Sequence, residues 1–388
     1  MLRQFLIGCA ILTAPLWLHG ATPSAPAAPQ QQACYITPHY DSFRPGKLWL
    51  DTDGRIINAH GGGILYHDGR YWWYGEHKGE NTNNAFVGIN CYSSADLYNW
   101  HYEGVVLPVS SDPQSPLVKD CIMERPKVIY CKKTGKFVMY FHLELQGRGY
   151  ECAHVAVAVS NSPTGPFRLI KHGRVNAGKA PLGTTVKQLR KDCKGRYDQP
   201  WWTAEWHDAI VKGLFAARDM EGGQMSRDMT LFVDDDGTAY HIYSSEDNLT
   251  MQIAELTPDY LDYTGRYIRI DPAGHNEAPA IFKKDGRYFL ITSGCTGWDP
   301  NAARLLTADS ILGTWTRHEN PCRGSGAEHT FSSQGTYILP VEGKKDTYIF
   351  LADRWQPSNP IDGRYVWLPI EFENGMPVLK WYDEWKLE

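Results

Sequence analysis

The sequence predicts an all-β protein, a five-bladed β-propeller with a long inserted loop between blades two and three. The main observation is an aromatic-rich hairpin that recurs along the chain, and each copy is followed by a second pair of expected strands. The turn and second strand of this hairpin occur at residues 68–76, 134–144, 236–246 and 285–294 and, in a more degenerate form, at 344–355. Because one four-stranded unit cannot bury both of its faces alone, we expect five such units to pack around a common axis.

The spacing of the turn glycines supports this repeat and shows where it is interrupted. Successive turn glycines lie about one blade apart, except that a much longer stretch separates Gly135 from Gly237. The excess falls at about 171–226, which we predict to be an insertion between two blades. Within it, residues 204–217 carry apolar side chains near helical spacing. Long ordered loops are often functional, although a decorative insertion fits the pattern equally well.

The first 21 residues have the composition of a secretory signal peptide (residues 1–21). Arg3 precedes an apolar run from Phe5 to Leu18, and small residues follow it. The run is too short to cross a bilayer, so we predict an exported protein, periplasmic or secreted, rather than a membrane span. Cys9 ends an LIGC sequence that resembles a lipoprotein acceptor site. It lies too early in the apolar run for us to expect a lipid anchor.

The rest of the chain divides into a short linker and one domain. Residues 22–34 form a low-complexity segment that we expect to be disordered, and the propeller should occupy residues 35–388. The formal net charge of −5 argues against a nucleic-acid partner. We expect the propeller to be a monomer.

Cysteine usage permits disulfide bonds but does not define them. Of the nine cysteines, Cys9 lies in the expected signal peptide, and the others allow many pairings in an exported chain. No Cys-x-x-Cys or His-x-His spacing indicates a metal site. The acidic run at 234–236 precedes a glycine and is better explained as a hairpin turn than as a metal site. We therefore predict no structural metal site and no cofactor; a metal ion in the central channel is not indicated by the sequence, which leaves that question open.

Glu277 occupies a position that suits a general acid. It begins the hairpin at 276–294 and is followed by Ala278 and Pro279, so we expect extended backbone at the residue before the proline. Propellers place their binding sites at the axis, where the innermost strands start, and this register puts Glu277 there. A carboxyl group at the mouth of a buried strand is a candidate general acid, although a single glutamate is more often a solvated loop residue.

Several long segments at the expected strand starts carry a family likeness. They are Ala59–Glu76 (AHGGGILYHDGRYWWYGE), Glu124–Tyr130 (ERPKVIY), Ser226–Tyr240 (SRDMTLFVDDDGTAY), Ser293–Asn301 (SGCTGWDPN) and Phe331–Thr336 (FSSQGT). Together with the Glu277-Ala278-Pro279 motif, they resemble glycoside hydrolase family 43, a family of five-bladed propellers. Within that family the likeness is to the exo-β-1,3-galactanase-like branch and its neighbours. The resemblance covers essentially the whole chain after the linker.

The resemblance implies an inverting glycosidase with an unusual water-activating group. Glu277 matches the family's general acid, but the aspartate that usually serves as the base falls in His60–Gly63, which has no carboxylate. The second-blade aspartate that usually tunes the acid falls near Lys127. The branch instead implies that Glu124 and Gln334 lie near the attacking water. An amide is a weak base, so Gln334 could act as its imidic tautomer, or orient the water while Glu124 takes the proton; the sequence leaves both open.

Further polar and aromatic residues at this end of the propeller are candidates for sugar binding. Sugars present hydroxyl groups to charged or amide side chains and C–H faces to aromatic rings. The candidates are His60, Glu76, Arg227, Asp228, Glu246, Asn248, Thr296, Trp298, His329 and Arg354. Each could instead make a structural hydrogen bond between blades. Likewise, Glu124 could form an ion pair with Arg125 or Lys127, and Gln334 could be an ordinary hydrogen-bonding residue of the channel.

The insertion contributes three tryptophans with two competing roles. Trp201, Trp202 and Trp206 suit a sugar platform, which would make the insertion one wall of the pocket and restrict the enzyme to chain ends. Alternatively, they pack against the outer surface of a blade and contact no sugar.

These observations lead to one functional reading and two alternatives. We predict an exported, inverting exo-glycosidase, galactan 1,3-β-galactosidase-like, that acts on plant or host polysaccharide side chains. Because the acid motif is shared within the family, an α-L-arabinofuranosidase or a β-xylosidase is the first alternative. Because the usual base is missing, a non-catalytic carbohydrate-binding propeller is the second. In each case the expected partner is an oligosaccharide or polysaccharide.

Overall fold

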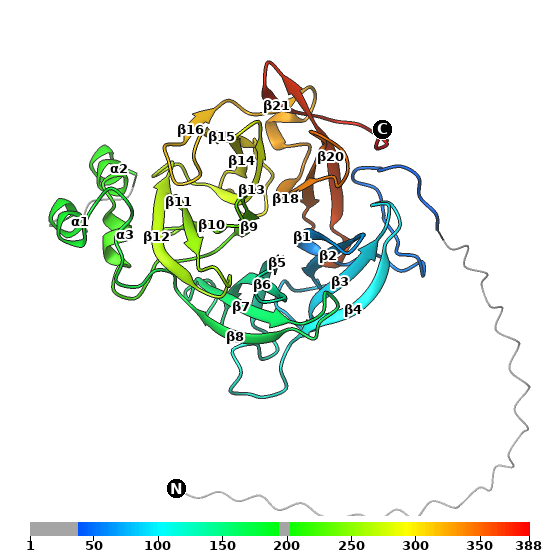
Figure 1. Cartoon of the computed structure of the whole chain (residues 1–388), viewed down its shortest axis with the longest axis horizontal. Coiled ribbons are helices and arrows are strands. Elements are labelled where there is room, and N and C mark those ends of the chain that lie inside the picture. Colours follow the sequence, from blue (N-terminus) through cyan, green and yellow to red (C-terminus); the bar gives the residue numbers. More distant parts are fainter. Residues whose placement is uncertain (1–37, 194–201) are drawn as a thin grey trace, which may run out of the picture. The chain divides into compact units, whose positions relative to one another are not determined.

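The computed structural model describes residues 38–193 and 202–388, and these form a five-bladed β-propeller (Figure 1). Five sheets surround one axis, with the earliest strand of each blade nearest the centre, so the predicted fold is confirmed. The expected signal peptide at 1–21 and linker at 22–34 lie outside the described residues and stay predictions. Among the described residues, no helix is long and apolar enough to cross a membrane.

The first four blades are four-stranded antiparallel sheets whose strands pair in chain order. Blade one contains β1 (His60–His67), β2 (Arg70–Glu76), β3 (Gly88–Ser94) and β4 (His101–Pro108). Blade two contains β5 (Ile122–Cys131), β6 (Lys136–Glu144), β7 (His154–Ser160) and β8 (Arg168–Gly173). Blade three contains β9 (Met229–Val233), β10 (Ala239–Ser245), β11 (Thr250–Leu256) and β12 (Tyr263–Ile270). Blade four contains β13 (Glu277–Lys284), β14 (Arg287–Ser293), β15 (Arg304–Ala308) and β16 (Thr316–His318).

Blade five departs from the predicted four-stranded unit by one strand. It contains β18 (Gln334–Pro340), β19 (Tyr348–Arg354), β20 (Arg364–Glu373) and β21 (Met376–Lys380). A short strand from the connection between blades four and five, β17 (Cys322–Arg323), pairs in parallel with β21. It covers part of an edge that would otherwise leave backbone groups unpaired. Two 3₁₀ helices, η1 (Ala327–His329) and η2 (Pro360–Asp362), lie in the connections of this region.

Apolar side chains fill each of the five seams between neighbouring blades. One cluster joins blades one and two, and corresponding clusters join two to three, three to four, and four to five. The last seam closes the ring between blades five and one, where the Trp73 and Trp367 rings lie 4.8 Å apart. Each blade thus buries both faces against its neighbours, which is the physical reason that a repeat predicts a closed ring.

The two ends of the described chain meet at this closing seam. Phe43 N donates to Trp385 O (2.8 Å), and Trp385 N donates to Phe43 O (3.0 Å). Their rings stack with centroids 4.4 Å apart. These contacts tie the segment before blade one to the segment after blade five.

The insertion runs from the end of β8 to the start of β9, and its described residues form the helices α1 (Val186–Cys193), α2 (Ala204–Val211) and α3 (Leu214–Arg218). Helices α2 and α3 confirm the helical spacing at 204–217. They lie at the outer rim of the propeller, beside β12 (Figure 1).

A buried ion pair joins the insertion to blade three. The Arg269 guanidinium on β12 donates to Ile210 O (2.7 Å) and Val211 O (3.1 Å), carbonyl groups at the end of α2. It is also paired with the fully buried Glu246 (2.6 Å). Glu246 is therefore engaged in holding the insertion.

Six described cysteines are free thiols, namely Cys91, Cys121, Cys131, Cys152, Cys295 and Cys322.

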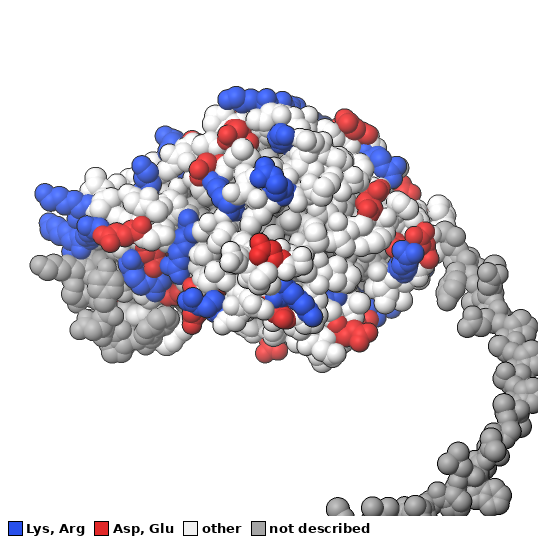
Figure 2. Space-filling view, turned by 90° about the horizontal axis from the view of Figure 1, so that it is seen from below, with Lys and Arg blue, Asp and Glu red and all other residues white. Residues whose placement is uncertain are grey.

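Acidic and basic side chains are interspersed on the face shown in Figure 2. Within 38–193 and 202–388, no group of three His, Cys, Asp or Glu side chains is arranged to hold a metal ion.

Glu246→Ala should lower the free energy of unfolding by about 3–5 kcal/mol, because it leaves the Arg269 charge buried without its carboxylate. Glu255→Ala is the matched control, since its partner Arg266 is exposed and such pairs contribute at most about 1 kcal/mol. Denaturant titration of both variants measures the difference. Equal midpoints for the two variants would show that Glu246 does not stabilise the fold.

Candidate active site

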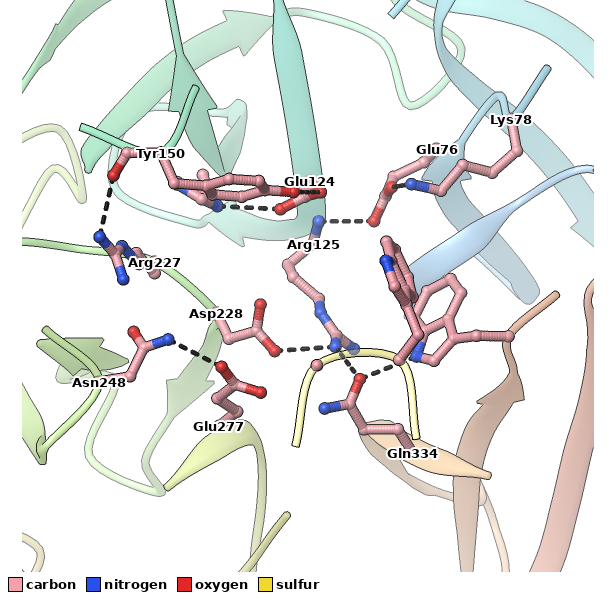
Figure 3. A pocket seen from close by; sticks show the side chains of 14 residues that line it. Glu76, Lys78, Glu124, Arg125, Tyr150, Arg227, Asp228, Asn248, Glu277 and Gln334 are labelled. Atoms are coloured by element: carbon pink, nitrogen blue, oxygen red, sulfur yellow. Dashed lines mark hydrogen bonds and ion pairs between the residues drawn. The ribbon is translucent and has the colours of Figure 1, made fainter. Parts of the chain in front are cut away.

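A pocket of about 390 Å³ opens at the centre of the propeller, where the innermost strands start. All five blades supply side chains to it, so no single blade could form the site. The lining residues are Glu76, Lys78, Glu124, Arg125, His142, Tyr150, Arg227, Asp228, Asn248, Glu277, Gly297, Trp298, Gln334 and Trp355 (Figure 3).

A recurrent β-bulge shapes the strand starts around this pocket. The pairing register breaks after His60 in β1, after Glu124 in β5 and after Glu277 in β13. Each of these residues is followed by one with positive φ: Gly61 at 58°, Arg125 at 57° and Ala278 at 51°. The extended backbone expected at Ala278 is therefore wrong. The bulge overrides the preference imposed by the following proline, and bulges commonly re-aim side chains beside active sites.

A carboxylate from a neighbouring element accepts a hydrogen bond from the backbone N–H of each bulged residue. Asp353 accepts from Gly61 (3.1 Å), and Glu76 accepts from Arg125 (2.9 Å). Asp228 accepts from Ala278 (3.1 Å). Each bond crosses a blade boundary, so these carboxylates hold the strand starts in position while two of them, Glu76 and Asp228, also line the pocket.

The Arg125 guanidinium lies at the centre of the polar network. It forms an ion pair with Asp228 (2.8 Å) and donates to Gln334 Oε1 (2.6 Å) and Gly335 O (3.1 Å). Its guanidinium carbon lies 5.3 Å from the Trp355 ring centroid. Because Arg125 is almost fully buried, its charge is compensated by these partners rather than by water.

Glu277 has the electrostatic environment of a general acid. Its Oε1 accepts a hydrogen bond from Asn248 (2.7 Å). Burial raises the pKa of Glu277 to about 7, and the negative charge of Asp228 contributes in the same direction, while Arg125 opposes the shift. A carboxyl group with a pKa near 7 retains its proton for donation at neutral pH.

Glu124 lies across the pocket from Glu277 in the opposite environment (Figure 3). Its Oε2 faces His142 Nδ1 (3.2 Å), and its Oε1 accepts from the Tyr150 hydroxyl (2.7 Å). Burial acts to raise the pKa of Glu124, but the hydrogen bond and charge of His142 outweigh it and bring the pKa to about 2. Neither Arg125 nor Lys127 forms the ion pair considered as the alternative for Glu124; its ionic partner is His142.

Gln334 is held by three hydrogen bonds that define its amide orientation. Arg125 Nη2 and Trp355 Nε1 both face its Oε1, the latter at 2.8 Å, and these groups can only donate. Ser293 Oγ donates to Gly294 O (3.0 Å), so it accepts from Gln334 Nε2 (2.9 Å). The three contacts match the ordinary amide, whose oxygen accepts and whose nitrogen donates.

Comparison with known proteins decides the family. A family model described as glycosyl hydrolases family 43 matches residues 198–377. A solved family 43 β-1,3-galactosidase with galactodeoxynojirimycin is 59% identical, with a TM-score of 0.86, and the alignment covers 89% of this chain and 100% of that one. The chain belongs to glycoside hydrolase family 43.

Two other relatives bear on this family 43 protein. The exo-β-1,3-galactanase from Clostridium thermocellum is 34% identical, with a TM-score of 0.71, over 88% of this chain and 66% of that one. A β-D-galactofuranosidase from Aspergillus niger is 28% identical over 81% of this chain and 77% of its own length. The β-1,3-galactosidase and the exo-β-1,3-galactanase agree with the branch that the sequence resembles.

The structure brings eight of the predicted site residues together in the family 43 pocket. They are the three proposed for the reaction and five of those proposed for sugar binding: Glu277, Glu124, Gln334, Glu76, Arg227, Asp228, Asn248 and Trp298.

Five predicted sugar-binding residues are not among the lining residues. His60 is fully buried beside Asp353 (3.2 Å), and Glu246 is paired with Arg269. Thr296 bonds within its own loop to Asp299 O (2.6 Å), and His329 is exposed in η1. Arg354 lines a neighbouring cavity and donates to Phe331 O (2.8 Å). Full burial against inter-blade partners contradicts sugar contact for His60 and Glu246. Thr296, His329 and Arg354 lie outside this pocket, and their sugar contact stays a prediction.

The described part of the insertion does not form a wall of the pocket. None of the described residues within 171–226 is among the lining residues. Trp206 is buried in a cluster made mainly by the insertion, and Trp202 is 70% exposed and stacks on His275. Trp201 lies outside the described residues.

Sequence reasoning missed Lys78, Arg125, His142, Tyr150, Gly297 and Trp355. Strict alternation puts neighbouring residues of a strand on opposite faces, so the sequence suggests Arg125 only as an ion-pair partner of Glu124. The bulge lets both side chains reach the site. His142 and Glu144 share one face of β6, and this spacing was the available signal for a charged cluster. Lys127, where the family usually has a tuning aspartate, is buried outside the pocket lining and donates to Gly61 O (2.9 Å).

Asp228→Asn should move the alkaline limb of the kcat/KM profile to lower pH. Glu277 works protonated, and its protonated fraction falls as pH rises through its pKa of about 7. The Asp228 charge raises that pKa, so removing it lowers the pKa and the limb follows. The exposed Asp235→Asn serves as the control and should leave the limb in place. A limb that stays fixed or moves upward in Asp228→Asn would contradict the assignment of Glu277.

Proposed function

We propose that this family 43 protein is an exported, inverting exo-glycosidase that removes terminal galactose from β-1,3-linked galactan. The observation that carries the proposal is the 59% identity with a β-1,3-galactosidase whose whole length the chain covers. The pocket supports it with two carboxyl groups whose pKa values are pushed apart, as acid and water-side groups require. Export rests on the signal-like composition of residues 1–21.

Sugar binding in this scheme uses the polar rim and the tryptophans of the pocket. Trp298 and Trp355 lie edge to face, with centroids 5.9 Å apart, and offer apolar surface to the C–H face of a sugar. Lys78, Glu76, Arg227 and Asn248 offer donors and acceptors for hydroxyl groups. A pocket of about 390 Å³ suits a terminal sugar unit better than the middle of a long chain, which supports exo action.

The reaction we propose is a single displacement. Glu277 donates its proton to the glycosidic oxygen as the bond from that oxygen to the anomeric carbon breaks. A water molecule attacks the anomeric carbon from the opposite face and loses a proton to Glu124. Glu277 ends ionised and Glu124 protonated, and exchange with solvent restores both. The products are the released sugar, with inverted configuration, and the shortened acceptor.

Glu124 is a better proton acceptor here than Gln334. An imidic tautomer would place a hydroxyl where Gln334 Oε1 now accepts from Arg125 and Trp355, and would remove a proton from the nitrogen that donates to Ser293. Glu124 is ionised throughout the working pH range. Its low pKa does not prevent proton transfer, because attacking water becomes strongly acidic as its bond to carbon forms. Gln334 then orients the water or substrate.

A screen of chromogenic glycosides tests the substrate class. We expect turnover of β-galactopyranosides, with galactofuranosides, α-L-arabinofuranosides and β-xylosides slower by at least about 10²-fold, because a site that hydrogen-bonds one sugar leaves its polar groups unpaired with another. The galactofuranoside arm is included because of the Aspergillus niger relative. Turnover of another sugar alone would reassign the substrate, and tight sugar binding without turnover would favour a binding protein.

Glu277→Gln should fold and bind galactose normally but lose about 10²–10⁴-fold of its turnover on β-1,3-galactobiose. Aryl galactosides with very good leaving groups should lose much less, because they need little protonation. Steady-state kinetics on both substrates make the comparison. Near wild-type activity on the disaccharide would rule out Glu277 as the acid.

The first sugar released should have the α configuration when a β-galactoside is cleaved. Proton NMR recorded during the first minutes of hydrolysis distinguishes the anomers before they interconvert. Net retention would exclude the single displacement and imply a covalent intermediate instead. Endo cleavage of long galactan from the outset would remove the exo assignment.

A further inference from the structure

Beside Glu124, His142 and Glu144 form a row of titratable groups that has no part in the mechanism so far. His142 lies on β6, is almost fully buried, and has a carboxylate at each ring nitrogen. Nδ1 faces Glu124 Oε2 (3.2 Å), and Nε2 faces Glu144 Oε1 (2.9 Å). A neutral imidazole carries one N–H and could donate to only one of them.

Glu144 is itself fixed as an acceptor. Its Oε2 accepts from Cys152 N (2.7 Å), and its Oε1 accepts from Ala153 N (2.9 Å) as well as facing His142. Both Glu144 oxygens are thus occupied by backbone N–H donors, and the side chain has no exposed surface. The same bonds anchor the loop between β6 and β7, which carries Tyr150, the second donor to Glu124.

We propose that His142 is a positioning residue that works as a buried imidazolium clamped between Glu144 and Glu124. Its charge keeps Glu124 ionised and its geometry aims the second oxygen of Glu124, together with Tyr150, at the water side of the pocket. This inference rests on the proposed function for its catalytic consequence, but not for the charge state of the clamp.

The surroundings of His142 support the charged form. Burial lowers the pKa of His142, but the hydrogen bonds to Glu124 and Glu144 outweigh it and raise the pKa to about 9. The other titratable groups nearby are Tyr150, whose ring centroid is 5.8 Å from that of His142, and His154 on β7. Glu124 in turn is influenced by Lys78 and Glu76 from blade one. Loss of the His142 proton would leave two buried carboxylates facing one donor.

The consequence is that the titration of His142 affects the rate at a higher pH than the titration of Glu277, which masks it with natural substrates. With a natural galactoside, activity should fall near pH 7 as Glu277 loses its proton, before His142 titrates. A substrate with a leaving group that needs no proton, such as dinitrophenyl β-galactoside, bypasses Glu277. Its kcat should therefore persist to higher pH and fall only near pH 9, as His142 becomes neutral.

The first test does not depend on activity. Imidazole ¹⁵N NMR of the full propeller should show both His142 nitrogens protonated at pH 7, with titration near pH 9. In Glu144→Gln the titration should move to lower pH, because one of the two carboxylates becomes neutral. A neutral His142 ring at pH 7 in the wild type would overturn the proposal whatever the enzyme hydrolyses.

The second test measures the catalytic consequence. His142→Gln should lower kcat on dinitrophenyl β-galactoside by about 10²-fold, the size of effect expected from a misplaced reacting group, with little change in KM. The fall in rate near pH 9 should also disappear. Glu144→Gln should retain more activity, with the fall at lower pH. His154→Gln is the matched control: this histidine faces His172 (3.2 Å) and should behave as wild type.

Three outcomes separate the possible failures. If His142→Gln keeps both its turnover and the fall near pH 9, the positioning role is wrong while the proposed function stands. If Glu144→Gln binds galactose and melts as the wild type does but shows an unchanged pH profile, the clamp is also wrong. If the wild-type protein hydrolyses no galactoside, the proposed function fails, and the NMR test still decides whether His142 is the clamped cation.

Discussion

The rest of the site depends on the contacts of the buried Arg125 guanidinium. One buried cation from blade two contacts Asp228 beside blade three and Gln334 in blade five, while its own backbone N–H is held by Glu76 in blade one. A charge buried this completely must keep its partners, so the four blades cannot shift independently at the axis. The positions of Gln334 and Asp228 follow directly from it. The environment of Glu277 depends on it as well, because Asp228 raises the pKa of Glu277 and Arg125 lowers it.

The two reactive carboxyl groups differ because their neighbours differ. Glu277 is half-buried, with a like charge close by, and Glu124 has an imidazole and a phenol directed at its oxygens. Hydrogen bonding to the ionised form lowers a carboxyl pKa, whereas burial and like charge raise it. The propeller supplies this contrast by drawing each group from a different blade. One strand or hairpin alone could not place a histidine behind one glutamate and an aspartate beside the other.

The described residues of the insertion are connected to the propeller wall, and none of them lines the pocket. The helices of the insertion contact blade three through an apolar cluster that includes Leu249 and through the hydrogen bonds of Arg269, which is paired with Glu246. This arrangement explains why Trp202 and Trp206, which look suited to sugar binding in sequence, contact His275 and the apolar cluster instead. Aromatic residues near a turn are as well explained by packing as by ligand contact, and only their neighbours distinguish the two.

The sequence by itself determined the propeller, because hairpins that cannot bury both faces alone must pack against copies of themselves. It also placed Glu277 near the axis, since this residue falls at the start of an innermost strand, and the family resemblance placed Glu124 and Gln334 in the same site. Only the tertiary structure decided which polar residues reach the pocket. His60 and Glu246 could bind sugar hydroxyl groups, but they are paired with Asp353 and Arg269, residues far away in sequence. Arg125 could not be assigned to the pocket from the sequence, because a bulge breaks the alternation that assigns residues to the two faces of a strand. The role of His142 could not be predicted either, because the charge of a buried group depends on side chains that only folding brings together.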